Sequence, residues 1–202
     1  MPPASATPPA PRPPGRARTF WNEGWPWLLG TLALWLVLAF GASLARVSGD
    51  SMNPTLHSGD TLLLLKYPRW LDPDFPRRGS VVVFRGPPDS PYAYTAHSLL
   101  GLEFQTRPAH IKRVLAVPGD RLELRGGRVW VNGRALAESY VSAEGFLEDQ
   151  APRTLGPGEV WVMGDNRRVG SSLDSRQYGP VRSQDILGTV PLRLWPAAST
   201  LP

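Results

Sequence analysis

The strongest constraint in this sequence is an uncharged apolar run near its N-terminus, WLLGTLALWLVLAFGASLA at residues 27–45. Coiled as an α-helix, the run would extend about 28 Å at roughly 1.5 Å per residue, close to the thickness of the hydrocarbon core of a bilayer. Tryptophans crowd its front edge, where aromatic rings favour the membrane–water interface; they are Trp21, Trp25 and Trp27. The pattern predicts a single transmembrane anchor, which we assign to residues 20–46.

The segment before the anchor predicts its orientation. Residues 1–19 are rich in proline and alanine and carry Arg12, Arg16 and Arg18, a composition that cannot form a core. We expect a disordered cytoplasmic tail, because positive charge flanking a span favours the cytoplasmic side, and the rest of the chain then faces outward.

A cleavable secretory signal is the alternative, since Ser43-Leu44-Ala45 offers small residues for cleavage. The apolar run exceeds the usual apolar core of such signals, roughly 7–15 residues, and the long proline-rich leader is atypical of them. A retained anchor therefore fits better.

After Arg46 the sequence changes to short apolar runs separated by Gly, Pro and Asp. They are too short for helices and rich in β-branched residues, which predicts strands at 61–67, 80–84, 111–117, 121–124, 128–133 and 160–163. Gly126-Gly127 and Asn132-Gly133 are typical of hairpin turns, because both pairs tolerate positive φ. The stretch 86–108 is interpreted as a loop or insertion. LLLL at 62–65 could enter lipid, although a buried strand explains it equally well.

The predicted fold class is thus mainly β: a single N-terminal transmembrane helix followed by an outward-facing, all-β domain. We place that domain at residues 47–195 and a C-terminal tail at 196–202.

Composition narrows the chemistry. The absence of cysteine excludes disulfides, thiolate catalysis and cysteine-ligated metals, and the three separated histidines favour no metal site; we expect no cofactor. The net charge of +5 comes from scattered arginines, with no basic helix to grip a nucleic acid. An anionic membrane surface suits that charge better.

Ser51 is a candidate nucleophile in the turn-like segment GDSMNPTLHSGD, directly after the apolar run. Many loop serines are inert, and a serine hydroxyl needs a base because it is not ionised near neutrality. No histidine is a convincing partner, and the sequence holds two lysines, Lys66 and Lys112.

Lys112 lies in the apolar run IKRVLAVPGD, where burial would disfavour its ammonium form. Lowering a lysine pKa from about 10.4 to about 8 costs roughly 3 kcal/mol, which a packed β-domain can supply. The alternatives are a paired structural lysine at this position and a solvated charge at Arg113.

Three segments, in this order, resemble the signatures of type I signal peptidases: GDSMNPTL, HIKRVLAVPGD and MGDNRRVGSSLDSR. The resemblance covers most of residues 47–182. It implies that Ser51 is the nucleophile, Lys112 the general base and Ser172 the hydroxyl that orients the lysine amine. The third signature is two residues longer than usual, so Ser171 is an alternative to Ser172.

The same resemblance implies further residues that support the site. Asp174 and Arg176 would be structural supports, and Asp165, Asn166 and Arg167 would shape the site. Gly49 takes the place of a serine that assists the oxyanion hole in some relatives, and Met52 follows the nucleophile. The backbone N–H of Ser51 would be one oxyanion donor, and the second donor stays open.

The activity implied is that of a membrane-bound endopeptidase that removes N-terminal signal peptides from exported preproteins. Its partners would be those preproteins and the lipid bilayer, in proximity to the protein export machinery, and its location the cytoplasmic membrane with the catalytic domain outside. The alternatives are a non-catalytic, membrane-tethered β module and a narrowly specialised Ser/Lys peptidase. A self-cleaving Ser/Lys regulator would need a DNA-binding helix–turn–helix, and the sequence offers none.

Overall fold

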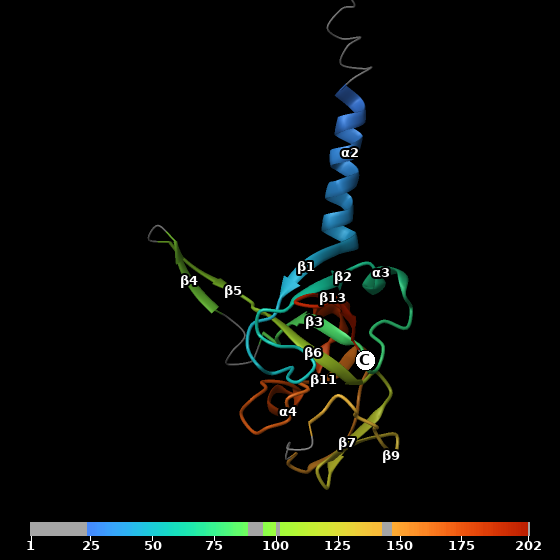
Figure 1. The fold of residues 1–202 in the computed structure, drawn as a ribbon. Helices are drawn as coiled ribbons and strands as arrows, with labels where there is room; N and C mark the ends of the chain where they lie inside the picture. The colour runs from blue at the N-terminus through green and yellow to red at the C-terminus, as the bar shows by residue number, and fades with distance from the viewer. Residues whose placement is uncertain (1–23, 89–94, 100–101, 143–146, 202) are drawn as a thin grey trace, which may run out of the picture. The chain divides into compact units, whose positions relative to one another are not determined.

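The computed structural model describes residues 24–88, 95–99, 102–142 and 147–201. Two compact units divide the chain, Met1–Ala39 and Phe40–Pro202, and each is described by itself. Helix α2 spans Trp25–Leu36 and continues into the π-helical turn η2 at Val37–Gly41 (Figure 1). The leucines of α2 favour helix, and a proline in its first turn is compatible with it because the first N–H groups have no intrahelical acceptor. None of its residues is buried.

In the part of the chain that the structure describes, no helix has both the length and the apolar character needed to cross a membrane. The helix predicted through residue 45 is wrong at its C-terminal end, because Ala42–Arg46 form strand β1. β1 pairs antiparallel with β2, Thr61–Leu65, and Ala45 packs against the core there. Tertiary pairing thus overrides the apolar pattern. The predicted tail at 1–19 lies outside the described residues.

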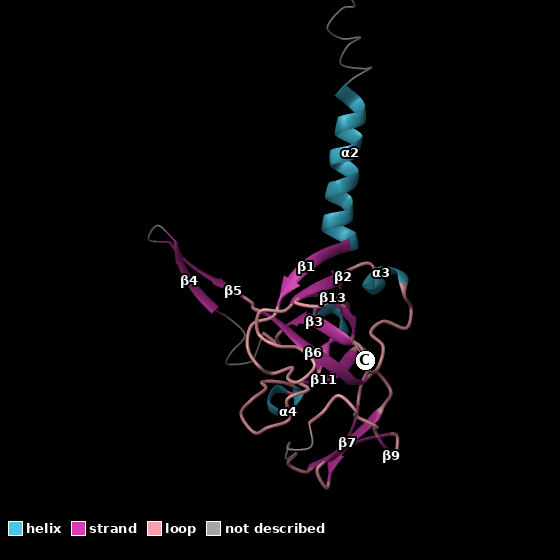
Figure 2. Ribbon diagram, in the orientation of Figure 1, coloured by secondary structure: helices cyan, strands magenta, loops and turns pink. Residues whose placement is uncertain are grey.

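An eight-stranded antiparallel sheet forms the centre of the second unit (Figure 2). Its strands run in the order β1-β2-β13-β3-β6-β11-β12, with β14 paired to β13. The remaining bounds are Val81–Arg85 for β3, Ala109–Ala116 for β6, Glu159–Met163 for β11, Val181–Arg182 for β12, Ile186–Trp195 for β13 and Ser199–Thr200 for β14. Because β6 lies between β3 and β11, Lys112 projects from the interior of the sheet.

A second sheet has the order β10-β7-β8-β9. Its strands are β7 at Arg121–Arg125, β8 at Arg128–Val131, β9 at Arg134–Ala135 and β10 at Gln150–Thr154. The hairpin predicted at Gly126-Gly127 is confirmed, since both glycines have positive φ and β7 pairs with β8. Asn132 and Gly133, at φ 52° and 77°, make the turn into β9.

The stretch 86–108 contains two strands that the sequence did not predict. β4, Thr95–Leu99, pairs with β5, Leu102–Thr106, as a two-stranded sheet of its own. This stretch is therefore a β-ribbon in part, and its residues 89–94 and 100–101 lie outside the described ranges.

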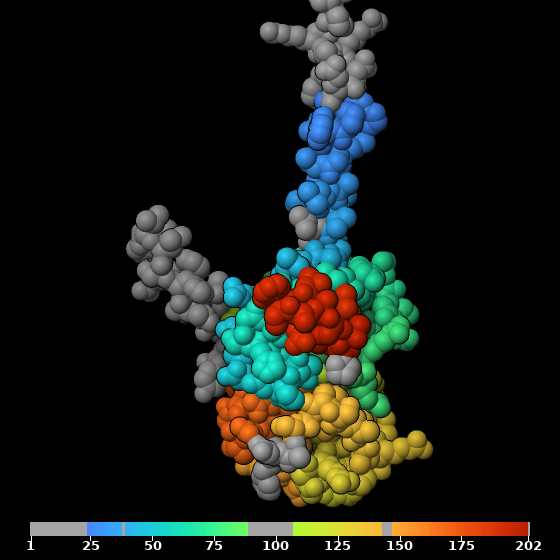
Figure 3. Space-filling model, in the orientation of Figure 1, coloured from blue at the N-terminus to red at the C-terminus, as the bar shows by residue number. Residues whose placement is uncertain are grey.

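The predicted strands of the large sheet are confirmed, and their alternation builds the core. In β2, Leu62 and Leu64 are buried while Leu63 and Leu65 are partly exposed, so burial in a strand explains two of the four leucines of the LLLL run. The C-terminal residues of β13 and β14 reach the surface beside the segment from β1 to β2 (Figure 3). Short helices complete the unit: α3 at Pro68–Leu71, α4 at Ser175–Tyr178 and the 3₁₀ turn η3 at Ser183–Asp185.

β13 is the central strand that sequence reasoning missed. Gly188 and Pro191 interrupt its apolar pattern, and both residues usually weaken a strand. Gly188 is required here by close approach, since a Cβ at this position would lie 2.2 Å from the carbonyl oxygen of Leu65 in β2.

Candidate active site

Ser51 lies in a turn between β1 and β2. Hydrogen bonds join the two ends of this turn, and one of its residues packs in the core. The two hydrogen bonds run from the Val47 N–H to the Asp60 carbonyl and from the Gly59 N–H to the Val47 carbonyl. Met52, the residue after Ser51, is buried and belongs to an apolar core cluster. Gly49 has φ +89°, which favours glycine at this position. The turn therefore holds Ser51 partly exposed, with hydrogen bonds at its two ends and a buried residue next to the serine.

Lys112 projects from β6 toward this turn. Its Nζ lies 2.7 Å from Ser51 Oγ and donates a 2.9 Å hydrogen bond to the Ile111 carbonyl. The side chain is 4% exposed, and burial lowers the pKa of Lys112 to about 8. The negative charges of Asp174 and Asp165 oppose that shift without cancelling it. The structure thus brings the two predicted central residues into direct contact.

The loop that follows β11 clasps the Ser51 turn. The Asn166 N–H donates to the Ser51 carbonyl at 3.1 Å, and the Asn166 side-chain amide donates to the Asp50 carbonyl at 3.0 Å. Gly164 fits between the two segments, because a Cβ there would lie 2.3 Å from both the Ser51 carbonyl oxygen and Ser172 Oγ. The third signature is therefore packed directly on the first.

Of the two serines considered for the orienting hydroxyl, Ser172 is buried and Ser171 is partly exposed. The Ser172 hydroxyl donates to Asp174 Oδ2 at 2.6 Å. Its role toward the lysine stays a prediction, because no hydrogen bond to Lys112 is found for it among the described residues.

Asp174 collects several donors in this region. Arg176 binds both carboxylate oxygens, through Nε and Nη2, at 2.8 Å each, and the Gly164 N–H donates to Oδ2 at 3.0 Å. Burial alone would raise the pKa of Asp174, but the hydrogen bonds and charge of Arg176 outweigh it and lower that pKa. An ionised carboxylate thus stands close behind Ser172.

Arg113 and Asp165 form a buried ion pair on the opposite side of β6 from Lys112. Both side chains are fully buried, with Nε–Oδ1 at 2.9 Å and Nη2–Oδ2 at 2.7 Å. Thr55 from the Ser51 turn donates to Asp165 Oδ2 at 2.6 Å. The interpretation of Arg113 as a solvated charge is therefore wrong: the pair joins β6 to the two loops of the site.

Sequence reasoning gave no role to Glu138 and Tyr140, which reach the same region from the segment after β9. The Glu138 carboxylate accepts hydrogen bonds from both terminal nitrogens of Arg167, and the Tyr140 hydroxyl donates a hydrogen bond to Glu138 at 3.0 Å. The Arg113 guanidinium stacks on the Tyr140 ring, 3.9 Å from its centroid. No local pattern could have revealed the contacts with the two arginines, because Tyr140 is 27 residues from Arg113 and Glu138 is 29 residues from Arg167.

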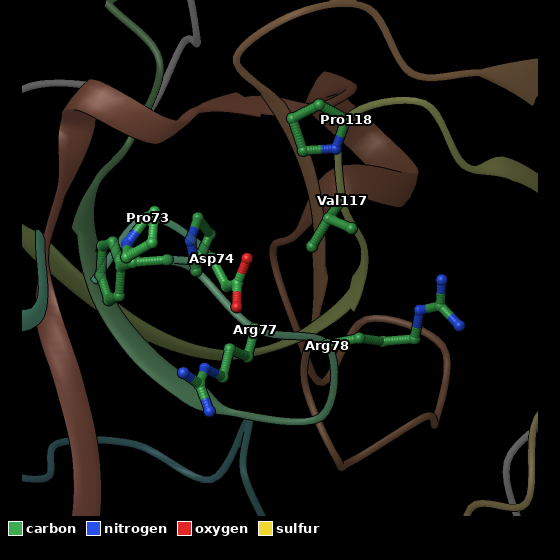
Figure 4. Close-up of a pocket in the computed structure, with 8 residues that line it drawn as sticks. Pro73, Asp74, Arg77, Arg78, Val117 and Pro118 are labelled. Atoms are coloured by element: carbon green, nitrogen blue, oxygen red, sulfur yellow. The ribbon is translucent and has the colours of Figure 1, made fainter.

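Elsewhere, a pocket of about 520 Å³ opens between the segment before β3 and the end of β6 (Figure 4). Arg77 and Arg78 point in opposite directions at its rim, and each is paired with an aspartate. The lining includes none of the residues gathered around Ser51. In the described ranges, no three His, Cys, Asp or Glu side chains gather as a metal site would require.

The arrangement around Ser51 can perform nucleophilic chemistry. A hydroxyl 2.7 Å from an amine can transfer its proton when that amine is neutral, and burial of Lys112 favours the neutral amine. This is what a serine hydrolase with a lysine base requires.

Comparison with known proteins agrees with that class. The model of the family described as signal peptidase, peptidase S26, matches residues 25–195. Probable signal peptidase I-1 of Synechocystis sp. is 35% identical over 181 residues, which cover 89% of this chain and 85% of that protein. Signal peptidase I of Bacillus caldolyticus is 31% identical over 185 residues, covering 85% and 90%. The chain belongs to the signal peptidase family, peptidase S26.

A solved structure of a signal peptidase I from Enterococcus faecalis V583 is also similar to this chain. Its TM-score is 0.42 at 24% identity, over 56% of this chain and 95% of that one.

The buried Arg113–Asp165 pair predicts a large stability effect. In Asp165→Asn the guanidinium stays buried without a full counter-charge, and we expect the free energy of unfolding to fall by about 3 kcal/mol. Urea denaturation of the purified chain measures it. Asp72→Asn is the matched control, because it removes a carboxylate that pairs with Arg77 at the surface, and it should leave unfolding unchanged. An equal effect of the two substitutions would contradict a stabilising role for the buried pair.

Proposed function

We propose that this chain is a membrane-bound endopeptidase that removes N-terminal signal peptides from exported preproteins, with Ser51 as nucleophile and Lys112 as general base. The observation that carries the proposal is the 2.7 Å contact between Lys112 Nζ and Ser51 Oγ in a buried setting. Membership of the signal peptidase family supports the substrate class. The contact also favours an enzyme over a non-catalytic β module.

The reaction proceeds through an acyl-enzyme. Neutral Lys112 takes the proton of Ser51 as its oxygen attacks the scissile carbonyl carbon, and the carbonyl oxygen becomes an oxyanion. The oxyanion collapses, the C–N bond breaks, and the Lys112 ammonium protonates the leaving amine. Water then attacks the ester with Lys112 again as the base, and Ser51 regains its proton as the carboxylic product leaves.

The lowered pKa of Lys112 determines what fraction of the molecules carries a neutral lysine base. At pH 7 a lysine with a pKa of about 8 is neutral in roughly one molecule in ten, whereas one at about 10.4 is neutral in fewer than one in a thousand. Burial against β3 and β11 therefore raises the active fraction by about two orders of magnitude.

The surrounding groups hold this pair in position. Asp174, fixed by Arg176, orients the Ser172 hydroxyl, which lies against Gly164 and in turn orients the lysine amine. Asn166 fixes the carbonyl groups of Asp50 and Ser51, so the Ser51 N–H keeps its direction as an oxyanion donor.

The substrate would bind as an extended strand along an exposed edge of the sheet, with alternate side chains entering pockets. The resemblance to type I signal peptidases implies small residues at the first and third positions before the cut.

Exposed apolar side chains support a membrane-bound chain. α2 and η2 together run from Trp25 to Gly41, about 25 Å at roughly 1.5 Å per residue, and α2 buries none of its side chains. A short apolar helix is accommodated by local thinning of the bilayer. We place this segment in the cytoplasmic membrane with the N-terminus inside and the catalytic domain outside, close to the export machinery.

The second unit carries an apolar row of its own. Leu44, Leu63 and Leu192 lie side by side on β1, β2 and β13, with Leu44 68% exposed. Such a row lies where an antiparallel sheet usually presents polar residues to water, and it supports a contact with lipid.

The proposed dyad predicts the outcome of two substitutions. With the full chain in detergent and a purified preprotein, Ser51→Ala and Lys112→Ala should each lower the cleavage rate by roughly a thousandfold or more, because each removes one partner of the proton transfer. Gel analysis and mass spectrometry of the new N-terminus measure it. Lys66→Ala, which removes the other lysine, should cleave like wild type. Residual cleavage in both dyad variants would reject the assignment, and cleavage of only a few preproteins would point to a narrowly specialised peptidase.

The lowered lysine pKa predicts the pH dependence. The base must be neutral, so kcat/KM should rise tenfold per pH unit below about 8 and level off above it. Lys112→Arg should be inactive at every pH, since a guanidinium stays protonated. A profile that still rises steeply to pH 10 would contradict a lowered pKa of the lysine base.

The proposed anchor predicts how the chain partitions. Expressed in bacterial cells, the full chain should stay in the membrane pellet after an alkaline carbonate wash. Leu32→Arg should release a large share, because a charge in a bilayer-embedded helix costs about 3 kcal/mol on the insertion scale. Arg85→Leu is a control that leaves α2 intact. Complete release of the wild-type chain would contradict the anchor.

A further inference from the structure

Gly164 is the most crowded of the glycines around Ser51. A Cβ at this position would lie 2.3 Å from both the Ser51 carbonyl oxygen and Ser172 Oγ, so there is no room for a side chain. Its N–H donates to Asp174 at 3.0 Å, and its carbonyl accepts from Arg167 Nε at 2.9 Å. Any shift of this residue therefore moves the Ser51 turn, the Ser172 hydroxyl or both.

Arg167 anchors the carbonyl side of Gly164. Its side chain is 2% exposed, so its charge needs a partner inside the protein. Nε is used by Gly164, and the two terminal nitrogens are both directed at one carboxylate, that of Glu138. The fork geometry of a guanidinium fixes its plane when two parallel hydrogen bonds form, and this in turn fixes the direction of Nε.

Glu138 is itself held in place. The Tyr140 hydroxyl donates to Oε1 at 3.0 Å, and the Tyr140 ring lies against the guanidinium of Arg113. Arg113 is the neighbour of Lys112 on β6 and pairs with Asp165. The short segment 138–140 thus contacts two arginines: Arg113 on β6, the strand that carries Lys112, and Arg167 in the loop that packs on the Ser51 turn.

We infer that Glu138 is a positioning residue for catalysis, which acts through Arg167 and Gly164 on the placement of Ser51 and Ser172. The inference rests on the proposed function for its catalytic consequence. It gives the segment after β9 a task in the reaction, although that segment contains neither the nucleophile nor the base. Glu138 is not a catalytic residue, because its carboxylate is occupied by hydrogen bonds from Arg167 and Tyr140.

The test compares Glu138→Gln with wild type in the full chain in detergent. The amide keeps the shape and loses the charge, so we expect kcat to fall about tenfold with KM unchanged, since small misplacements of reacting groups lower rates steeply. Glu159→Gln is the matched control: it makes the same change at another glutamate that binds an arginine, Arg153, and should leave kcat unchanged. All rates are measured well below each variant's melting temperature, which separates positioning from loss of folded protein.

Two further measurements decide the route. In an Arg167→Met background, Glu138→Gln should have no additional effect on kcat, because the intermediary is already gone. Hydrogen exchange followed by mass spectrometry should show faster exchange in residues 47–56 and 164–172 for Glu138→Gln and not for Glu159→Gln. Unchanged exchange in both segments, or additive effects of the two substitutions, would overturn the inference. If wild type fails to cleave any preprotein, the proposed function fails while the exchange data still decide the role of Glu138.

Discussion

The site depends on one energetically unfavourable feature, the burial of a lysine side chain away from water. Holding Lys112 in the interior of the sheet disfavours its ammonium form, and at neutral pH a pKa of about 8 costs the fold about 3 kcal/mol relative to a solvated lysine. Three buried apolar clusters and an eight-stranded sheet surround β6 and offset that cost. The packing of the sheet and the core thus keeps the Lys112 amine away from water and next to the Ser51 hydroxyl.

The alternation of β6 divides two tasks between neighbouring residues. Lys112 faces the Ser51 turn, while Arg113 faces the other way and is neutralised by Asp165. Because one strand carries both residues, the register that fixes Lys112 also fixes the ion pair that ties the loops together. A slip of one residue would move each side chain to the opposite face and could place the permanently charged guanidinium of Arg113 beside Ser51.

Much of this could be predicted from the sequence, because its signals are local. Short β-branched runs predicted the strands around Lys112, the glycine pairs predicted the hairpins, and an isolated lysine in an apolar run pointed to a buried base. What failed was non-local: β1 looks like the end of an apolar helix until it pairs with β2, and β13 is hidden by Gly188 and Pro191 although it pairs with β2 and β3. In the site, the ion pair between Glu138 and Arg167 could not be predicted for the same reason, since the two residues are distant in sequence.

The ribbon of β4 and β5 pairs with itself, apart from the strand order of the large sheet. It enters after β3 and returns at β6, so insertions or deletions within it leave the register of both strands intact. Packing of the large sheet therefore does not constrain the length of this ribbon during evolution. A change in the length of the ribbon would thus leave Lys112 and the residues around it in place.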